Sequence, residues 1–317
     1  MTKEMEMENN KIGSAIQYFR ESYHISQSKL CKGLCSVATL SRIEAGERDV
    51  DSLLLETLLE RLGRMPNQFE LILTDMDYVL YQNREDIKKQ IENKNYSEAY
   101  ALLNEYEEIA SSKGSVHLQF IISHKALLNE LNGKPVEDTI ELLMEAITCT
   151  VPDFNTDEIK KYYLSNSELY IIIDIIQQML SAGMISRAKK ILIEILDYLE
   201  NNNSMEENNR LYPKVAIMAS RLFMQENSLD QALEMCNKGL DKNKGSRKMD
   251  YLGDLCLLKA QITERLLEAQ NQWEISQKEC LKLYIQAYHV LNFCEEQTTA
   301  EEIKKHLQEE YRWVDID

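Results

Sequence analysis

The side chains best suited to contact another molecule lie in the stretch SQSKLCKGLCSVATLSRIEAGER, residues 26–48. Val37, Ala38 and Thr39 are small or able to hydrogen-bond, and they stand at the start of a short helical pattern. Arg42 follows one turn later, on the exposed face of the same pattern. Such a helix suits the major groove of double-stranded DNA, where side chains must approach the base edges closely.

Three neighbouring residues complete the candidate DNA contacts. Gln27 is expected at the start of the preceding helix, where its amide and its backbone N–H can meet a phosphate. Ser36 is expected to cap the helix that carries Arg42. Arg48 is either a phosphate contact or a solvated loop charge. The predicted DNA-binding residues are therefore Gln27, Ser36, Val37, Ala38, Thr39, Arg42 and Arg48.

Five short helical patterns are expected to position these residues between residues 10 and 64. The first runs from Lys11 to Tyr23, with its apolar residues at the 3.6-residue period. Ser26 can cap a second helix, and the third is expected to end before Gly46, which tolerates a left-handed conformation. Asp51 begins a leucine-rich helix. The segment 65–77 is expected to be a short connection with at most one helical turn.

Four recurring turn signatures predict paired helices beyond residue 77. Each has a small or polar turn, an apolar residue and then a small residue three positions later. The small residues are Ala99, Thr139, Ala188 and Ala232, at spacings of 40, 49 and 44 residues. Because each signature lies between two amphipathic segments, each unit is expected to be a helical hairpin.

A fifth pair is expected over roughly residues 249–267 and 276–293, with a cap near residues 299–313. We therefore predict an all-α fold with a five-helix domain at residues 1–66, a linker at 67–77 and an α-solenoid of about five helical hairpins at 78–317. Stacked hairpins of this kind form a superhelix with a concave face. The chain has only 10 Gly and 4 Pro among 317 residues, which agrees with an almost entirely helical fold.

The net charge of −17 argues at first against nucleic acid, because phosphates repel an acidic surface. The charge is unevenly distributed. Residues 1–64 hold 9 Lys and Arg against 10 Asp and Glu, so almost all of the excess lies in residues 65–317. We therefore expect weak non-specific DNA binding, with operator choice dependent on dimerisation and on contacts near Arg42.

The pattern SQxxL, then Ser36, then TLSRIEAGER resembles the helix-turn-helix of Xre/Cro-type repressors, over about residues 11–64. This resemblance implies a partly buried ion pair between Arg20 and Glu44. The Leu-Cys-Ser segment before the third helix, joined to long helical repeats, is similar to the peptide-sensing Rgg/PlcR-type (RRNPP) regulators of Gram-positive bacteria. That resemblance implies quorum sensing through tetratricopeptide-like repeats that hold a homodimer and bind a signalling peptide in the concave groove.

The small residues of the turn signatures set a register that projects certain side chains onto this concave face. Amides there can satisfy a peptide backbone, and cations can meet its carboxylates. Scattered charges on solvated helix faces are the alternative interpretation. The candidate effector-binding residues are Arg84, Lys88, His124, Asn166, Tyr170, Gln177, Lys214 and Arg221.

No catalytic, cofactor or metal motif is expected. GxGxxG, P-loop, HExxH and GxSxG patterns are absent from the sequence, and its five histidines are dispersed. Cys31 and Cys35 lie one helical turn apart. Two interpretations are open for them: oxidant sensors or packing residues. No window approaches 18 uninterrupted apolar residues, and the first residues lack an apolar signal segment, so we expect a cytoplasmic protein without a membrane span.

Two functions remain open from the sequence. The first is a homodimeric, sequence-specific transcriptional regulator whose repeats bind a small effector, an oligopeptide. Two-fold symmetry would double the few base contacts of one helix-turn-helix module across paired half-sites. The alternative is a scaffold whose repeats bind a protein partner while the N-terminal domain tethers the assembly to DNA.

Overall fold

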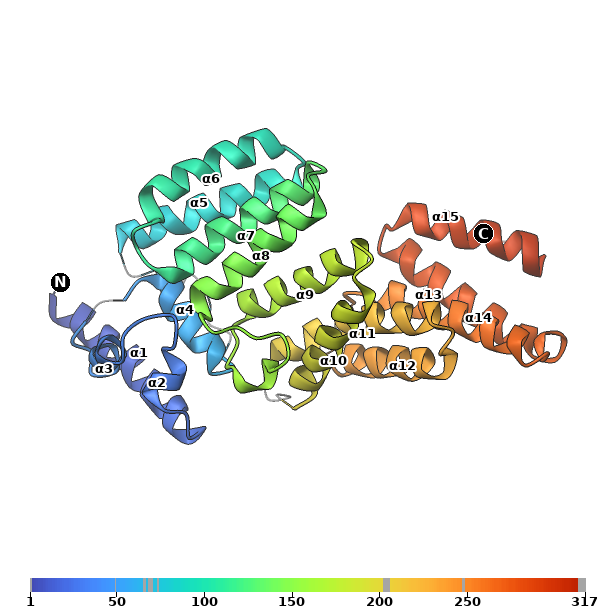
Figure 1. Ribbon diagram of the computed structural model, residues 1–317, viewed down its shortest axis with the longest axis horizontal. Helices are drawn as coiled ribbons and strands as arrows, with labels where there is room; N and C mark the ends of the chain where they lie inside the picture. The colour runs from blue at the N-terminus through green and yellow to red at the C-terminus, as the bar shows by residue number, and fades with distance from the viewer. Residues whose placement is uncertain are drawn as a thin grey trace. The chain divides into compact units, whose positions relative to one another are not determined.

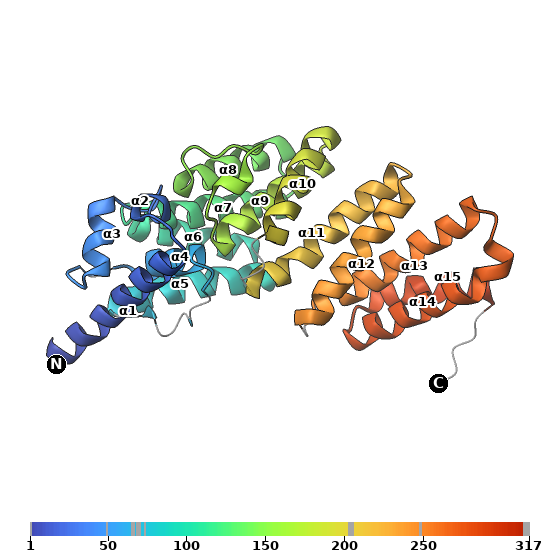
Figure 2. The same ribbon diagram turned by 90° about the horizontal axis from the view of Figure 1, so that it is seen from below.

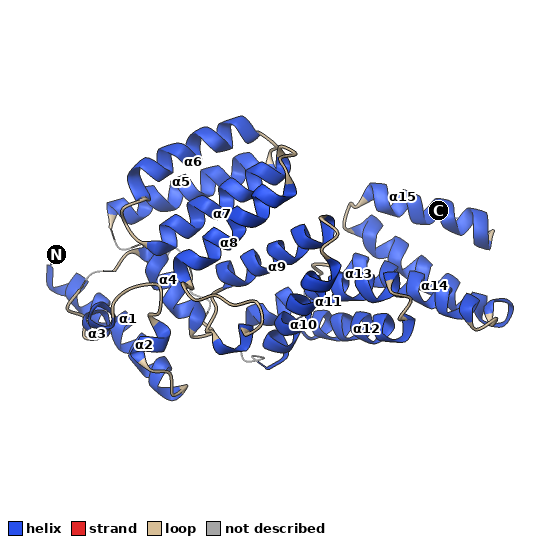
Figure 3. Ribbon diagram, in the orientation of Figure 1, coloured by secondary structure: helices blue, strands red, loops and turns tan. Residues whose placement is uncertain are grey.

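A computed structural model describes residues 2–48, 50–64, 67, 71–72, 74–201, 206–246 and 249–312. Within these ranges all regular structure is helical, as Figure 3 shows, so the predicted all-α fold is confirmed. The chain divides into two compact units, residues 1–194 and residues 195–317, which are described separately.

Four α-helices form the N-terminal segment, residues 2–64, which we call the head (Figure 1). They are α1 (Thr2–Ser22), α2 (Gln27–Leu30), α3 (Val37–Glu44) and α4 (Ser52–Arg61). Helix α1 begins earlier than expected, and α2 ends at Leu30 rather than Leu34. The described residues between 10 and 64 thus hold four helices rather than the five expected there, and the turn expected at 65–77 lies mostly outside the described residues.

Side-chain caps fix where the head helices begin. The Ser26 hydroxyl accepts from the Lys29 N–H, and the Ser36 hydroxyl accepts from the Thr39 N–H. These bonds satisfy amide groups that have no partner within the helix. Gly46 has φ of 71°, the left-handed conformation expected at the end of α3. The local sequence thus sets the start and end of the helix that carries Arg42.

The head has its own apolar core, in which α1 and α3 approach closely. Ile16, Leu40 and Ile43 are buried there. A Cβ at Gly13 would lie 2.1 Å from the Ile43 carbonyl oxygen, so glycine is needed for this contact. The core therefore fixes α3 against α1 and leaves the opposite face of α3 exposed.

Six further helices follow in the first unit, and α10 continues past its end. They are α5 (Asp75–Glu92), α6 (Tyr96–Ala110), α7 (Ser115–Leu131), α8 (Val136–Thr150), α9 (Asn166–Ser181) and α10 (Ile185–Asn201). Ala99, Thr139 and Ala188 are almost completely inaccessible, as the repeat signatures predicted. Figure 2 shows α5 to α9 beside the head.

The second unit contains five helices that pack around one apolar core. They are α11 (Glu206–Gln225), α12 (Leu229–Ser246), α13 (Leu252–Ala269), α14 (Trp273–Phe293) and α15 (Gln297–Tyr311). Ala232, the small residue of the fourth signature, is fully buried. The packed pairs α5 with α6, α7 with α8, α11 with α12 and α13 with α14 match four of the five predicted hairpins, and α15 lies where the cap was expected.

A buried ion pair joins the head to the helices that follow it. The Arg61 guanidinium, at the end of α4, lies 2.5 Å from the Glu168 carboxylate in the first turn of α9. The same guanidinium donates to the carbonyls of Leu30 and Lys32 after α2, and to that of Thr150 at the end of α8. Arg61 and Glu168 are 3% and 0% exposed, so every charge-bearing atom has a partner instead of water.

The charge on Glu168 depends on that arginine. Burial alone would raise the pKa of Glu168, but the charge of Arg61 and its hydrogen bonds lower the pKa below the usual value. Ser165 adds a capping box, in which its backbone N–H donates to the carboxylate. Because the folded-state pKa is depressed, this contribution to stability is present above the ordinary glutamate pKa and is lost on acidification below it.

We expect Glu168→Gln to destabilise the first unit by about 3–5 kcal/mol, because it leaves the buried Arg61 without a counter-charge. Urea unfolding followed by circular dichroism measures this loss. The matched control is Glu158→Gln, which breaks an exposed ion pair with Lys161 and should change stability by about 0.5 kcal/mol or less. Equal midpoints for the two variants would contradict the role given to this pair.

Candidate DNA interface and ligand cavities

Helix α3 presents the exposed face that the sequence predicted. Ser36, Val37, Ala38 and Arg42 are exposed, and Thr39 is half-buried. Val37 has 45% of its surface exposed although it is apolar. An exposed apolar side chain beside an arginine on a short capped helix is suited to close contact with base edges and thymine methyl groups.

A polar network behind α3 holds this face in place. Arg20 Nε lies 2.7 Å from Glu44 Oε1, which confirms the ion pair implied by the resemblance. Its hydrogen bonds with Glu44 raise the pKa of Arg20, so the guanidinium stays charged. Gln27 differs from expectation: its side-chain amide donates to Glu44 Oε2 at 2.7 Å. The Glu44 carboxylate that pairs with Arg20 also accepts the hydrogen bond from the Gln27 amide. The Gln27 amide is therefore directed to Glu44 and not to a phosphate.

Arg48 lies beside the exposed face of α3. Its guanidinium donates to the Thr39 hydroxyl at 3.2 Å, and this hydroxyl is 2.9 Å from that of Ser36. The three residues therefore form one polar group at the start of α3. Arg48 is therefore tied to the start of α3 and is not an isolated loop charge.

The two head cysteines are packing residues in this structure. Cys31 is buried and Cys35 is half-buried, and both are free thiols. Burial raises the pKa of Cys35 to about 11 and also raises that of Cys31. Thiols of this kind react slowly with oxidants because the thiolate is scarce at neutral pH.

The structure corrects the prediction for Arg84. We expected this residue on an exposed concave face, but it is buried, and its guanidinium donates to the Tyr106 hydroxyl at 3.3 Å. That hydroxyl lies 2.7 Å from His117 Nδ1, and His117 Nε2 lies 3.1 Å from the Asp51 carboxylate. Arg84 thus belongs to a polar chain that links α5 to the cap of α4, which its helical position alone could not reveal.

His124 and Tyr170, two of the predicted effector residues, line one cavity of about 220 Å³. The cavity lies between α4 of the head and helices α7 and α9, and we call it the junction cavity. Burial lowers the pKa of His124 to about 4, so the imidazole is neutral. Its ring lies on that of Phe120, with centroids 3.9 Å apart. The lining residues are Leu53, Thr57, Val116, Gln119, Phe120, Ser123, His124, Leu127, Ser167, Tyr170, Ile171 and Asp174.

Asn166 is placed at the head rather than at a ligand groove. Its backbone N–H and side-chain amide donate to the two oxygens of Glu60 on α4, at 3.1 and 3.0 Å. This is a correction, because both groups are occupied by a carboxylate of the chain itself. Burial, with Glu56 nearby, raises the pKa of Glu60 to about 8.

The remaining predicted effector residues do not form a common site within either unit. Lys88 pairs with Glu85 at 2.7 Å, and Gln177 is exposed on α9. In the second unit Lys214 and Arg221 lie on α11, and Arg221 pairs with Asp254 at 3.4 Å. Their role in ligand binding stays a prediction.

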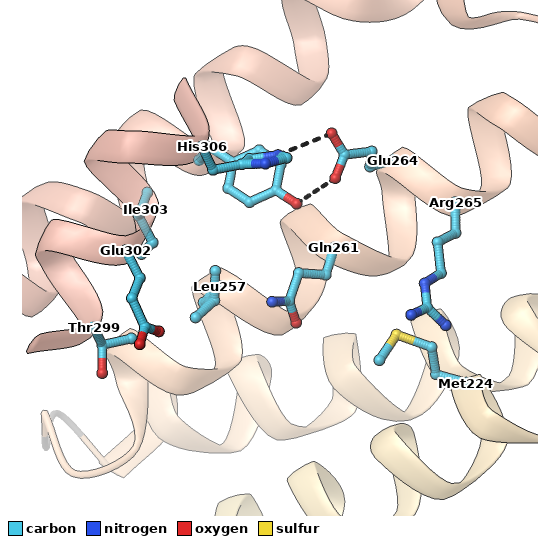
Figure 4. A pocket seen from close by; sticks show the side chains of 10 residues that line it. Met224, Leu257, Gln261, Glu264, Arg265, Thr299, Glu302, Ile303 and His306 are labelled. Atoms are coloured by element: carbon cyan, nitrogen blue, oxygen red, sulfur yellow. Dashed lines mark hydrogen bonds and ion pairs between the residues drawn. The ribbon is translucent and has the colours of Figure 1, made fainter. Parts of the chain in front are cut away.

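Sequence reasoning missed a cavity of about 410 Å³ in the second unit (Figure 4). The Glu264 carboxylate lies in its wall, 3.1 Å from His306 Nε2 and hydrogen-bonded by Tyr284. Tyr284 lies on α14, whereas His306 and Tyr311 lie on α15, and their spacing in the sequence shows no motif. The other lining residues are Met224, Leu257, Gln261, Arg265, Thr299, Glu302 and Ile303.

Among the described residues, no group of three or more His, Cys, Asp or Glu is placed to hold a metal ion. No helix among them is both long and apolar enough to cross a membrane.

Residues 16–66 match a family model described as helix-turn-helix, which covers α2 to α4 and the last third of α1. This segment is therefore a helix-turn-helix domain. No curated protein sequence matches the chain.

Solved structures resemble the chain over most of its length. Bacillus thuringiensis PlcR in complex with the peptide PapR7 and DNA matches with a TM-score of 0.56 at 19% identity, over 93% of this chain and 99% of that one. Apo PlcR from the same organism gives 0.58 at 17% identity, over 93% and 98%. BtubC from P. vanneervenii gives 0.53 at 14% identity, over 69% and 82%. At these identities the likeness is one of fold, and it confirms the resemblance to PlcR-type proteins at that level.

The raised pKa of Glu60 gives a test by pH. The folded state keeps the Glu60 proton up to about pH 8, whereas the unfolded chain releases it near pH 4.3. Between these two pH values the folded state binds more protons than the unfolded chain. The contribution of Glu60 to stability is therefore full below about pH 4.3 and is lost as pH rises through about 8. We expect the melting temperature of Glu60→Gln to rise relative to that of the native protein as pH increases from 5 to 8.

Differential scanning calorimetry across this range measures the change. Glu98→Gln, at an exposed position on α6, serves as the control and should follow the native pH profile. A Glu60→Gln profile parallel to that of the native protein would show that the carboxyl is already ionised at pH 5.

Proposed function

We propose that the protein is a sequence-specific DNA-binding transcriptional regulator that acts as a homodimer in the cytoplasm and senses an oligopeptide through its helical repeats. The observation that carries the first part is the exposed face of α3, held from behind by Arg20, Glu44 and Gln27. A braced helix with a fixed set of outward side chains gives base contacts of defined geometry. PlcR, which shares the fold, has been crystallised with both a peptide and DNA.

Base contacts are assigned to the first turns of α3. Val37 and Ala38 offer apolar contact to thymine methyl groups, while Arg42 reaches a guanine edge or a phosphate. Arg48 and Ser36 contact the phosphates on either side of the groove. One head makes few contacts, so a second copy of the chain, related by two-fold symmetry, is needed to read paired half-sites.

The effector acts by binding one state of the protein more tightly than another. The junction cavity supports this mechanism because its walls come from α4, α7 and α9. A peptide side chain in the cavity touches the head and the repeats together. Its binding energy therefore depends on how α4 lies against α7 and α9.

Arg42→Ala tests the DNA interface. We expect it to weaken binding to an operator obtained by selection from random duplexes about 10- to 100-fold, because a base or phosphate contact is lost. Fluorescence anisotropy at fixed salt measures the affinity. The control is Arg187→Ala, which removes an exposed arginine on α10. Unchanged affinity and unchanged selected sequences for Arg42→Ala would refute the assigned role of α3.

Ser123→Trp tests the effector site by filling the junction cavity with a large ring. Pools of synthetic heptapeptides are screened for a change in operator affinity or in the mass measured by light scattering. We expect a peptide that acts on the native protein and on Ser181→Trp, an exposed control on α9, to have no effect on Ser123→Trp. A full response of Ser123→Trp places the effector elsewhere, and no response of the native protein to any pool counts against peptide sensing.

A further inference from the structure

The cavity beneath α15 in the second unit is built around a carboxylate whose partners are two tyrosine hydroxyls and a histidine ring. Glu264, on α13, accepts hydrogen bonds from the hydroxyls of Tyr284 and Tyr311 and lies 3.1 Å from His306 Nε2. The Glu264 side chain is only 15% exposed. Burial, followed by the hydrogen bond to Glu264, raises the pKa of Tyr284, so its hydroxyl keeps its proton and donates.

The charges of this cavity do not balance. Among the described residues, no Lys or Arg lies within ion-pair distance of Glu264. The ion-pair partner of Glu264 among them is His306, which is charged only when it is protonated. The lining holds two carboxylates, Glu264 and Glu302, against one guanidinium, Arg265. In Figure 4 the Arg265 guanidinium lies beside Met224, away from the Glu264 carboxylate. A carboxylate largely removed from water gains most from a cation that enters with hydrogen-bond donors.

Aromatic side chains lie next to the same carboxylate, and of these Tyr284 and His306 line the cavity. The ring of Tyr284 lies 4.8 Å from that of His306 and 5.9 Å from that of Tyr311, and Tyr311 stands edge-on to Trp273 at 5.4 Å. Tyrosine and tryptophan faces attract ammonium and guanidinium groups through their quadrupoles. A carboxylate within a group of aromatic rings therefore favours organic cations over inorganic ones.

The remaining walls add size and apolar contact. Met224, Leu257 and Ile303 come from α11, α13 and α15, and Gln261 and Thr299 supply hydrogen-bonding groups. A volume of about 410 Å³ is within the range of pockets that hold small organic ligands. The cavity can thus hold an alkyl chain with its charged end at Glu264.

From these features we infer that the cavity is a binding site for a primary ammonium or guanidinium group carried on an alkyl chain. Glu264 receives the cation, Glu302 adds charge from the opposite wall, and the apolar residues contact the chain. The group comes either from a free polyamine or from a basic side chain of a peptide. The site stands apart from DNA binding, so its failure would leave the role of α3 untouched.

Titration calorimetry on the full chain without DNA tests the site with three probes. Spermidine represents a free polyamine, acetyl-Leu-Lys-Leu-amide a basic peptide, and acetyl-Leu-norleucine-Leu-amide its neutral isostere. We expect spermidine or the lysine peptide to bind at least about tenfold more tightly than the norleucine peptide, as a charge-assisted hydrogen bond predicts. Whichever cationic probe binds identifies the source. Equal binding of the charged and neutral peptides with no binding of spermidine, or no binding of any probe, would overturn the inference.

Variants then locate the binding. Glu264→Gln should lower the affinity for the cationic probe about tenfold or more, and Glu302→Gln should lower it by a smaller factor. Glu301→Gln, an exposed neighbour on α15 outside the lining, should bind like the native protein. Circular dichroism checks that Glu264→Gln is folded. If it is not, Glu302→Gln decides, and native affinity in that variant would then contradict the site.

Discussion

The buried ion pair between Arg61 and Glu168 constrains the first unit more than any other polar contact described. One guanidinium connects the turn after α2, the end of α4, the end of α8 and the start of α9. Replacing a buried pair by apolar residues often costs little, whereas removing one partner costs much. The value of this pair therefore lies in fixing a particular arrangement of the head on the repeats. The close approach at Gly33, where a Cβ would lie 1.9 Å from the Thr150 carbonyl oxygen, fixes the same contact sterically.

This constraint shapes how a ligand can act on DNA binding. Since the head belongs to the same compact unit as α5 to α9, an effector cannot reorient α3 without working against these contacts. The junction cavity and Glu60 lie along the same boundary. In the proposed mechanism, ligand binding, protonation of Glu60 and head position thus involve neighbouring residues, which is the condition for coupling between sites.

The fold could be predicted from the sequence because its signals are local. Ser26 and Ser36 mark helix starts through their side-chain caps, and Gly46 marks a helix end through its left-handed backbone. The small residues Ala99 and Ala232 mark close packing within hairpins. The candidate sites depend on contacts between distant segments, for which sequence spacing carries no signal. Asn166 lies in a helical register that favours exposure, yet its side-chain amide donates a hydrogen bond to Glu60, which lies 106 residues earlier in the chain. The cavity around Glu264 likewise needs tertiary packing of α13, α14 and α15.

We infer that the head and the neighbouring repeat helices form one cooperative unit. Native-state hydrogen exchange with increasing denaturant measures the opening free energy of each helix. The account predicts that the slowest amides of α3, α4 and the first turns of α9 converge on a single opening free energy. It would be contradicted if α3 and α4 opened together at a clearly lower free energy while α9 kept its protection, because the head would then move independently of the repeats.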